Sequence, residues 1–215
     1  MRLTLAAMRL HDEEPEAGPF EPVTAAELAA LLPSGRALVV VDGRSGGGKT
    51  TVADRLGHPV VHTDDVAWQH HPTDWADILL DHVVAPWRRG EPVSYRPPAW
   101  DRLDRPGAIE VPVCDVLVVE GVGAGRAAVA AHADLVVWVQ SDRDEARRRG
   151  IARDIEYGRT PDEAEEFWDG WMRSEDPFLA AERPWTRAHL VVSGTPPVDG
   201  AADGRVWVAR GSASL

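Results

Sequence analysis

Short runs of consecutive apolar residues, rich in valine, alternate along the chain with segments whose apolar positions recur at helical spacing. An unbroken apolar run predicts a strand buried on both faces, and such runs occupy residues 37–42, 59–62, 115–120, 135–139 and 190–192. Helical spacing and capping residues predict helices at 25–32, 49–56, 73–89 and 126–132, with two more beginning after Asp142 and Thr160. This alternation predicts the α/β class, with a doubly wound, mostly parallel five-stranded sheet and helices on both faces.

Two segments depart from this alternation. Residues 1–22 show no sustained period, so we expect an N-terminal arm or an edge element there. The proline-bearing segment 93–98 cannot be helical, and together with residues 108–111 it suggests a small hairpin or flap over a site. No internal repeat or low-complexity linker interrupts the rest of the chain, so we expect residues 23–215 to form a single domain.

Charge and cysteine content narrow the classes of partner. The formal net charge of −12 argues against a nucleic-acid partner, because such binding needs clustered positive charge. The single cysteine, Cys114, excludes an intramolecular disulfide and suits a reducing compartment. No apolar run approaches membrane-spanning length, and the acidic residues 12–14 are unlike a secretory signal. We therefore expect a cytoplasmic protein without a membrane partner, and the sequence leaves open whether it forms a homo-oligomer.

A glycine-rich loop directly follows the first predicted strand and precedes a helix. It matches the full eight-residue P-loop pattern and continues with Thr51; its residues are Gly43, Arg44, Ser45, Gly46, Gly47, Gly48, Lys49 and Thr50. In a P-loop, backbone amides wrap the phosphates, the lysine reaches the β- and γ-phosphates, and the threonine hydroxyl ligates Mg²⁺. We expect this loop to bind ATP with Mg²⁺; the alternative is a flexible glycine turn. Lys49 is also the only lysine among 23 basic residues, at the position where a compact ammonium is needed.

Acidic residues stand at the ends of two predicted strands, where the carboxyl edge of a parallel sheet meets its ligand. Asp64 and Asp65 follow the second strand, and Glu120 ends the third. Asp64 is the candidate base for an attacking hydroxyl, or a ligand of magnesium through water, and Glu120 has the Walker-B position near the metal. The alternatives are helix capping for the aspartates and an ordinary solvent-facing carboxylate for Glu120.

Arginines cluster in one predicted helix of this acidic chain, at residues 147–149 and 153, with Arg159 following. Arg149 and Arg153 are four residues apart, so they share a helical face and are placed to clamp transferring phosphates. We expect a helical lid at about residues 143–175 that brings both arginines to the reaction. The alternative is a solvated helix face whose arginines pair with neighbouring acids.

Aromatic residues are unusually frequent, with nine tryptophans in the chain. Six of them lie in segments that we expect near the open side of the sheet: Trp68, Trp75, Trp100, Trp168, Trp171 and Trp185. They could stack an aromatic base or wall an apolar pocket, or each could simply pack in the core. The adjacent His70 and His71 are weak evidence for a metal, because no third ligand stands at usable spacing.

The order of these features resembles the uridine kinase-like branch of P-loop kinases, which includes uridine–cytidine kinase, phosphoribulokinase and bacterial pantothenate kinase. The resemblance spans residues 37–194 and rests on five short matches, at residues 42–51, 63–65, 95–98, 119–121 and 149–159. It implies a base at Asp64, a glutamate near magnesium at Glu120, and lid arginines at Arg149, Arg153 and Arg159. Residues 66–68 and 94–101 depart from the pyrimidine-nucleoside kinase pattern, which leaves the acceptor open.

Motif and resemblance together predict a small-molecule kinase that transfers a phosphoryl group from ATP to a hydroxyl, with a nucleoside such as uridine as one candidate acceptor. The residues expected to bind the acceptor are Asp65, Tyr95, Arg96, Trp100 and Arg159. One alternative is a kinase of a vitamin precursor, sugar phosphate or antibiotic, and another is an ATP-binding regulatory switch. A Ras-like switch is disfavoured because its Asn-Lys-x-Asp motif requires asparagine, which this chain lacks.

Overall fold

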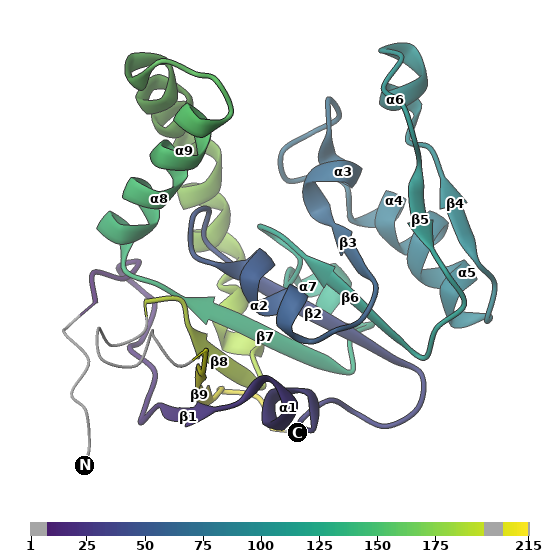
Figure 1. The fold of residues 1–215 in the computed structure, drawn as a ribbon, viewed down its shortest axis with the longest axis horizontal. Coiled ribbons are helices and arrows are strands. Elements are labelled where there is room, and N and C mark those ends of the chain that lie inside the picture. Colours follow the sequence, from purple (N-terminus) through teal and green to yellow (C-terminus); the bar gives the residue numbers. More distant parts are fainter. Residues whose placement is uncertain (1–7, 196–203, 215) are drawn as a thin grey trace.

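A seven-stranded sheet forms the centre of the computed structural model, which describes residues 8–195 and 204–214 (Figure 1). Its spatial order is β1-β9-β8-β7-β2-β6-β3. The strands are β1 Glu21–Val23, β2 Ala37–Gly43, β3 Val60–His62, β6 Val116–Glu120, β7 Leu135–Gln140, β8 Leu190–Ser193 and β9 Val206–Arg210. The five strands from β8 to β3 run parallel and are the five that the sequence predicts. The predicted α/β fold class is therefore confirmed.

The sheet is wider than predicted because two antiparallel strands extend one edge. β9 pairs with β8, and β1 pairs with β9. Antiparallel edge strands need no crossover helix, so an alternation of strands and helices does not mark them. Other parts of the segment expected as an arm or edge also contact the sheet, since Glu14 accepts hydrogen bonds from the Trp138 indole (2.6 Å) and the Gln140 amide (2.9 Å). Residues 1–7 of that segment lie outside the described residues.

Helices connect the parallel strands, and three of them begin where the sequence predicts a capping residue. Thr24 with Glu27 and Thr160 with Glu163 form capping boxes, and Asp142 caps the helix that follows it. The α-helices are α1 Ala25–Ala29, α2 Lys49–Arg55, α3 Thr63–Ala67, α4 Ala76–Leu79, α5 Ala85–Arg88, α6 Pro98–Arg102, α7 Ala127–Ala130, α8 Arg143–Glu156 and α9 Pro161–Glu182. A short 3₁₀ turn, Pro184–Arg187, follows α9.

The helix predicted over residues 73–89 exists, but it is not uniform. A π-helical turn, Leu80–Val84, joins α4 to α5, and the Ala85 N–H bonds to the Leu80 carbonyl, five residues back. Pro86 follows immediately. Proline has no N–H, and its ring clashes with the carbonyl four residues earlier, so a locally widened turn accommodates it in a continuous helical segment.

The predicted hairpin is present as a separate two-stranded sheet. β4 (Val93–Tyr95) pairs antiparallel with β5 (Ile109–Val111), and α6 lies in the connection between them. Figure 1 shows α3 and this hairpin unit on one side of the P-loop end of the sheet, and α8 and α9 on the other. The two groups of elements therefore flank the loop at the carboxyl end of β2.

The core lies on both faces of the sheet, because successive residues of a strand point in opposite directions. In β2, Leu38 and Val40 join the cluster formed with α4, α5 and the hairpin. Val39 and Val41 join the opposite cluster, with α1, α2, β8 and β9. All four side chains are completely buried, as expected for a sheet covered by helices on both faces. Across the described residues, we find no helix that combines the length and apolar character needed to span a bilayer.

Candidate active site

The glycine-rich loop leaves the carboxyl end of β2 and enters α2, as the sequence predicts. β2 lies between β6 and β7, where the chain connections turn toward opposite edges of the sheet. Open α/β sheets bind their ligands at such a switch point. Gly46 adopts φ +70°, and a Cβ added there would lie 2.1 Å from the Ala146 carbonyl oxygen in α8. Only glycine fits this position, and the loop therefore packs directly against the lid helix.

The side chains of Lys49 and Thr50 lie on the inner side of the loop. Lys49 is 8% exposed, and its Nζ donates to the Arg44 carbonyl at 2.9 Å. The Thr50 hydroxyl donates to Oε1 of Glu120 at 3.1 Å, so the P-loop threonine meets the carboxylate that ends β6. The sequence predicts Thr50 at the start of the helix after the P-loop and Glu120 at a strand end, and the structure brings the two side chains into contact.

Glu120 is a buried acid with a second partner that the sequence analysis missed. His62 Nδ1 lies 2.5 Å from Glu120 Oε1, because the two residues are register neighbours on β3 and β6. Burial acts to raise the pKa of Glu120, but the His62 hydrogen bond and the charge of Lys49 outweigh it and lower the pKa. The same hydrogen bond raises the pKa of His62. Glu120 is therefore held as a carboxylate beside Thr50.

These oxygens fit the ligand preferences of magnesium. A hydroxyl and a carboxylate are hard donors, and Mg²⁺ typically uses one or two protein carboxylates together with water and substrate phosphates. Residues 8–195 and 204–214 contain no group of three or more His, Cys, Asp or Glu side chains suited to hold a metal ion. Magnesium bound mainly by phosphates and water needs no such group. Thr50 and Glu120 are thus the residues best placed to hold it, and Asp64 lines the same cavity.

A second buried acid, Asp42, joins the P-loop to the loop after β6. It is completely buried and accepts hydrogen bonds from the backbone N–H groups of Gly43 (2.7 Å), Gly123 (2.9 Å) and Gly125 (2.8 Å). Burial raises the pKa of Asp42 to about 6, against the opposing effects of these N–H donors and of Lys49. One carboxylate thus fixes two loops at the carboxyl edge of the sheet.

A cavity of about 680 Å³ opens at this edge and joins the P-loop to Asp64. Six residues of the expected phosphate-binding segment line it: Ser45, Gly46, Gly48, Lys49, Thr50 and Thr51. Gly43, Arg44 and Gly47 are not among the lining residues, and Arg44 is only 3% exposed. Glu120 and Gly121 form the part of the wall next to the loop.

The two aspartates after β3 have different surroundings. α3 begins at Thr63 with His62 as its N-cap, so neither aspartate is the helix cap considered as an alternative. Asp64 is exposed and lines the cavity. Asp65 forms an ion pair with Arg105 at 2.5 Å and is not a lining residue. The structure thus places Asp64, and not Asp65, at the cavity.

Three residues expected to bind the acceptor lie away from the cavity. Tyr95 stacks on His82 with a centroid separation of 4.4 Å, and Arg96 pairs with Asp101 at 2.7 Å. Trp100 is 4% exposed and belongs to the core. None of the three lines the cavity. The hairpin unit packs against α4, α5 and the π-helical turn. Its residues therefore do not reach the opening of the cavity.

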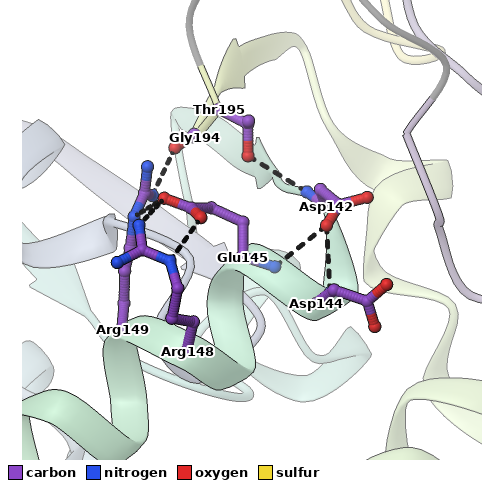
Figure 2. A network of polar contacts seen from close by, with 7 residues as sticks. All are labelled: Asp142, Asp144, Glu145, Arg148, Arg149, Gly194 and Thr195. Carbon is purple, nitrogen blue, oxygen red and sulfur yellow. Dashed lines mark hydrogen bonds and ion pairs between the residues drawn. The ribbon is translucent and has the colours of Figure 1, made fainter.

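Arg149 lines the cavity but already has partners (Figure 2). Its Nε pairs with Glu145 Oε1 at 2.8 Å, and its guanidinium donates to the Gly194 carbonyl at 2.6 Å. Arg148 binds the same glutamate from the exposed face of α8. Figure 2 shows Glu145 between the two arginines, and Arg149 linking α8 to the segment after β8.

The remaining lid arginines share one acid. Arg153 lines the cavity and pairs with Asp154 at 3.2 Å. Arg159 lies 3.7 Å from the other oxygen of Asp154 and stacks on Phe167 at 3.9 Å. It belongs to a separate open hollow on the lid rather than to the main cavity. The structure therefore brings Arg149 and Arg153 to the P-loop cavity, whereas Arg159 lies outside it.

Aromatic side chains form the walls of the cavity beyond the phosphate-binding loop. Trp68 lines it from the end of α3, and Phe167, Trp168 and Trp171 line it from α9. His70 and His71 also line this part. The other three tryptophans expected near the open side are at most 4% exposed and pack in the core: Trp75, Trp100 and Trp185. Position along the chain did not distinguish wall residues from core residues, because burial depends on tertiary packing: Trp75 and Trp100 pack in the cluster beside β2 and β6, and Trp185 packs against Trp138.

Comparison with known proteins defines the fold. No protein-family model and no curated protein matches the chain in sequence. A solved structure assigned as a fructose transport system kinase, from Silicibacter sp. TM1040, matches 75% of this chain and 93% of its own, with 21% identity and a TM-score of 0.52. This likeness is one of fold: the α/β architecture of the chain is similar to that of this structure.

Two further solved structures match less closely. A protein described as a possible uridine kinase, from Bacillus stearothermophilus, matches 78% of this chain and 94% of its own, with 20% identity and a TM-score of 0.49. Shikimate kinase from Acinetobacter baumannii matches 83% of this chain and 91% of its own, with 17% identity and a TM-score of 0.36. At such identities the activity has to be argued from the chemistry of the site itself.

Proposed function

We propose that this protein is a kinase that transfers the γ-phosphoryl group of ATP, with Mg²⁺, to a hydroxyl of a small molecule. The observation that carries the proposal is the single cavity that joins the P-loop to Asp64 and to an aromatic compartment beyond it. A nucleotide on the loop would direct its terminal phosphate toward that compartment. A carboxylate stands where the two parts meet.

The polar residues near the phosphate-binding loop have distinct roles in this proposal. Lys49 and the loop amides bind the β- and γ-phosphates, after Lys49 has exchanged its contact with the Arg44 carbonyl for the ligand. Thr50 and Glu120 hold magnesium, which would neutralise charge on the transferring phosphate. Asp64 orients the acceptor hydroxyl and takes its proton late in the transfer. Arg149 and Arg153 approach the phosphates when the lid closes.

The aromatic walls favour an acceptor that contains a ring. The indole of Trp68 and the side chains of Phe167 and Trp171 offer flat apolar surfaces. The arginines among the described lining residues are Arg149 and Arg153, which this proposal assigns to the phosphates of ATP. The compartment therefore favours an uncharged acceptor over a phosphorylated one. A nucleoside meets both requirements, and so does an aromatic alcohol.

The experiment is a measurement of ADP formation from ATP with Mg²⁺, with and without a panel of acceptors. The panel contains nucleosides, aromatic alcohols, sugars and sugar phosphates at equal concentration. The proposal expects ADP formation that depends on an acceptor, with transfer of one phosphate to it detected by mass spectrometry. Slow hydrolysis that no member of a broad panel accelerates would instead support an ATP-binding switch.

A further inference from the structure

Glu175 is a buried acid that the proposed reaction does not use. It lies in the middle of α9 and is completely buried. Its carboxylate accepts hydrogen bonds from the backbone N–H of Ser45, at 3.1 and 3.3 Å, and from the indole N–H of Trp171, at 2.6 Å. Ser45 belongs to the P-loop, and Trp171 belongs to the aromatic wall of the cavity. A single side chain thus joins the two halves of the site.

The position of the Glu175 carboxylate depends on both of its hydrogen-bond donors, Ser45 and Trp171. Among the residues that the structure describes, Glu175 takes part in no ion pair, so neutral N–H groups stabilise it. A buried carboxylate that loses a donor keeps the cost of its desolvation without that compensation. If the Ser45 amide moves, Glu175 must either follow it and strain its hydrogen bond to Trp171, or lose the Ser45 donor. Movement of the Trp171 indole strains the hydrogen bond to Ser45 in the same way.

We propose that Glu175 is a positioning residue that couples the phosphate-binding loop to the aromatic wall of α9. The inference rests on the proposed binding of nucleotide at the P-loop. Phosphate oxygens bound to the loop amides restrict the loop, and the Ser45 N–H then becomes a fixed donor for Glu175. Glu175 in turn holds the Trp171 indole, so the wall that faces the acceptor becomes ordered once nucleotide is bound. The order of substrate binding would follow from this coupling.

Amide hydrogen exchange in α9 (Pro161–Glu182), measured with and without MgADP, tests the coupling. Two variants each remove one part of the link: Glu175→Gln keeps the size but replaces one accepting oxygen with an amide that donates, and Trp171→Phe keeps a ring without the N–H. Glu166→Gln is the matched control, because Glu166 is an exposed glutamate of the same helix. MgADP should slow exchange around residues 168–175 by roughly three- to tenfold in the original protein and the control, and this slowing should be lost in both variants.

A purely structural role for Glu175 gives a different result. In both variants, exchange in α9 would then be faster than in the original protein by the same factor with and without MgADP. MgADP would still slow exchange in each variant, and that outcome overturns the coupling. If Glu175→Gln does not fold, Trp171→Phe decides the question with the carboxylate intact. Calorimetry with MgADP on the original protein separates the two proposals. Absence of binding contradicts the proposed function and the coupling together, whereas binding with unchanged exchange in α9 contradicts the coupling alone.

Discussion

Lys49 combines burial with a contact that a ligand can replace. Its ammonium is bound to a carbonyl of its own loop, at 2.9 Å, and the side chain is 8% exposed. Lys49 is the only lysine of the sequence, whose other basic side chains are arginine or histidine, so the choice of lysine is specific to this loop. A flexible stem and a compact charge allow the side chain to move from the carbonyl to a phosphate without disturbing the core.

Replacement of Lys49 by alanine should therefore abolish phosphoryl transfer while leaving the fold in place. Lys49→Arg should also be poorly active, because a planar guanidinium cannot occupy the position of a point charge. Activity is measured as acceptor-dependent ADP formation, and folding by circular dichroism and thermal unfolding. Near-normal turnover in the folded Lys49→Ala protein would remove the P-loop lysine from the mechanism.

Asp64 is the residue at which kinase and switch hypotheses differ. Asp64→Asn should leave nucleotide affinity nearly unchanged, because the P-loop supplies most phosphate contacts, while turnover should fall by roughly 10²–10⁴-fold, the usual effect of losing a positioned general base. Asp65→Asn is the control, since Asp65 faces Arg105 and not the cavity. Equal loss of turnover in both variants would indicate that α3 had been disturbed and that Asp64 has no catalytic role of its own.

Individual residues were predictable where a local motif or a strand end identifies them. The P-loop and Glu120 belong to this group, and the contact between Thr50 and Glu120 follows from the adjacency of β2 and β6. His62 and Glu175 were not predictable, because no local motif identifies them, and Glu120 and Ser45, which they contact, are 58 and 130 positions away in the sequence. Their roles appear only when strand register and helix packing are known.

At the scale of the secondary-structure elements, the contact between the end of β2 and the loop after β6 depends on one titratable group, the carboxyl group of Asp42. The pKa of Asp42 is raised by burial to about 6, so the folded protein binds this proton more tightly than the unfolded chain does. Protonation of Asp42 therefore favours the folded state at low pH. That contribution to the free energy of unfolding is lost as the pH rises to about 6 and through it.

The pH dependence can be isolated by comparison with Asp42→Asn, which lacks this titration. The free energy of unfolding of the original protein minus that of the variant should decrease between about pH 4 and pH 6, with a limiting slope of roughly 1.4 kcal/mol per pH unit, and level off above about pH 7. Urea denaturation at several pH values measures it. A difference that grows with pH would show that the backbone N–H donors outweigh burial.

Elements with a strong period were predictable, but their irregularities were not. The helical pattern at residues 73–89 gives the right element, whereas the π-helical turn before Pro86 depends on how that proline is accommodated. The hairpin was predictable because the proline-bearing segment 93–98 was not expected to be helical and residues 108–111 offered a partner strand. The hairpin packs on the α4–α5 segment, and its residues Tyr95 and Arg96 do not line the cavity.

At the scale of the whole molecule, the sheet order explains why residues distant in sequence meet at one edge. β2 lies between β6 and β7, so the P-loop, Glu120 and the start of α8 converge at its carboxyl end. The five parallel strands were predictable because each is an unbroken apolar run, typical of a strand buried on both faces. The possibility of an edge element in residues 1–22 agrees with β1 at the edge of the sheet, whereas β9 was not predicted.

This convergence predicts that nucleotide stabilises the entire fold and not only the loop. The P-loop, α2 and β6 all contribute residues to the cavity, and α8 packs on the loop at Gly46, so global unfolding must release a nucleotide bound there. A ligand at about 100 times its Kd adds roughly 2.7 kcal/mol to the free energy of unfolding. For a chain of this size, that corresponds to a rise in Tm of about 5–11 °C.

Thermal unfolding with MgADP, with ADP plus a chelator, and with no ligand measures this effect. The rise in Tm should be largest with MgADP, because Thr50 and Glu120 then contribute through the metal, and smaller when magnesium is removed. Lys49→Ala should show less than half of the rise at the same concentrations, since the lysine contacts the phosphates directly. An equal rise in Lys49→Ala would place the nucleotide elsewhere on the molecule, because a ligand that does not touch the P-loop is indifferent to its lysine.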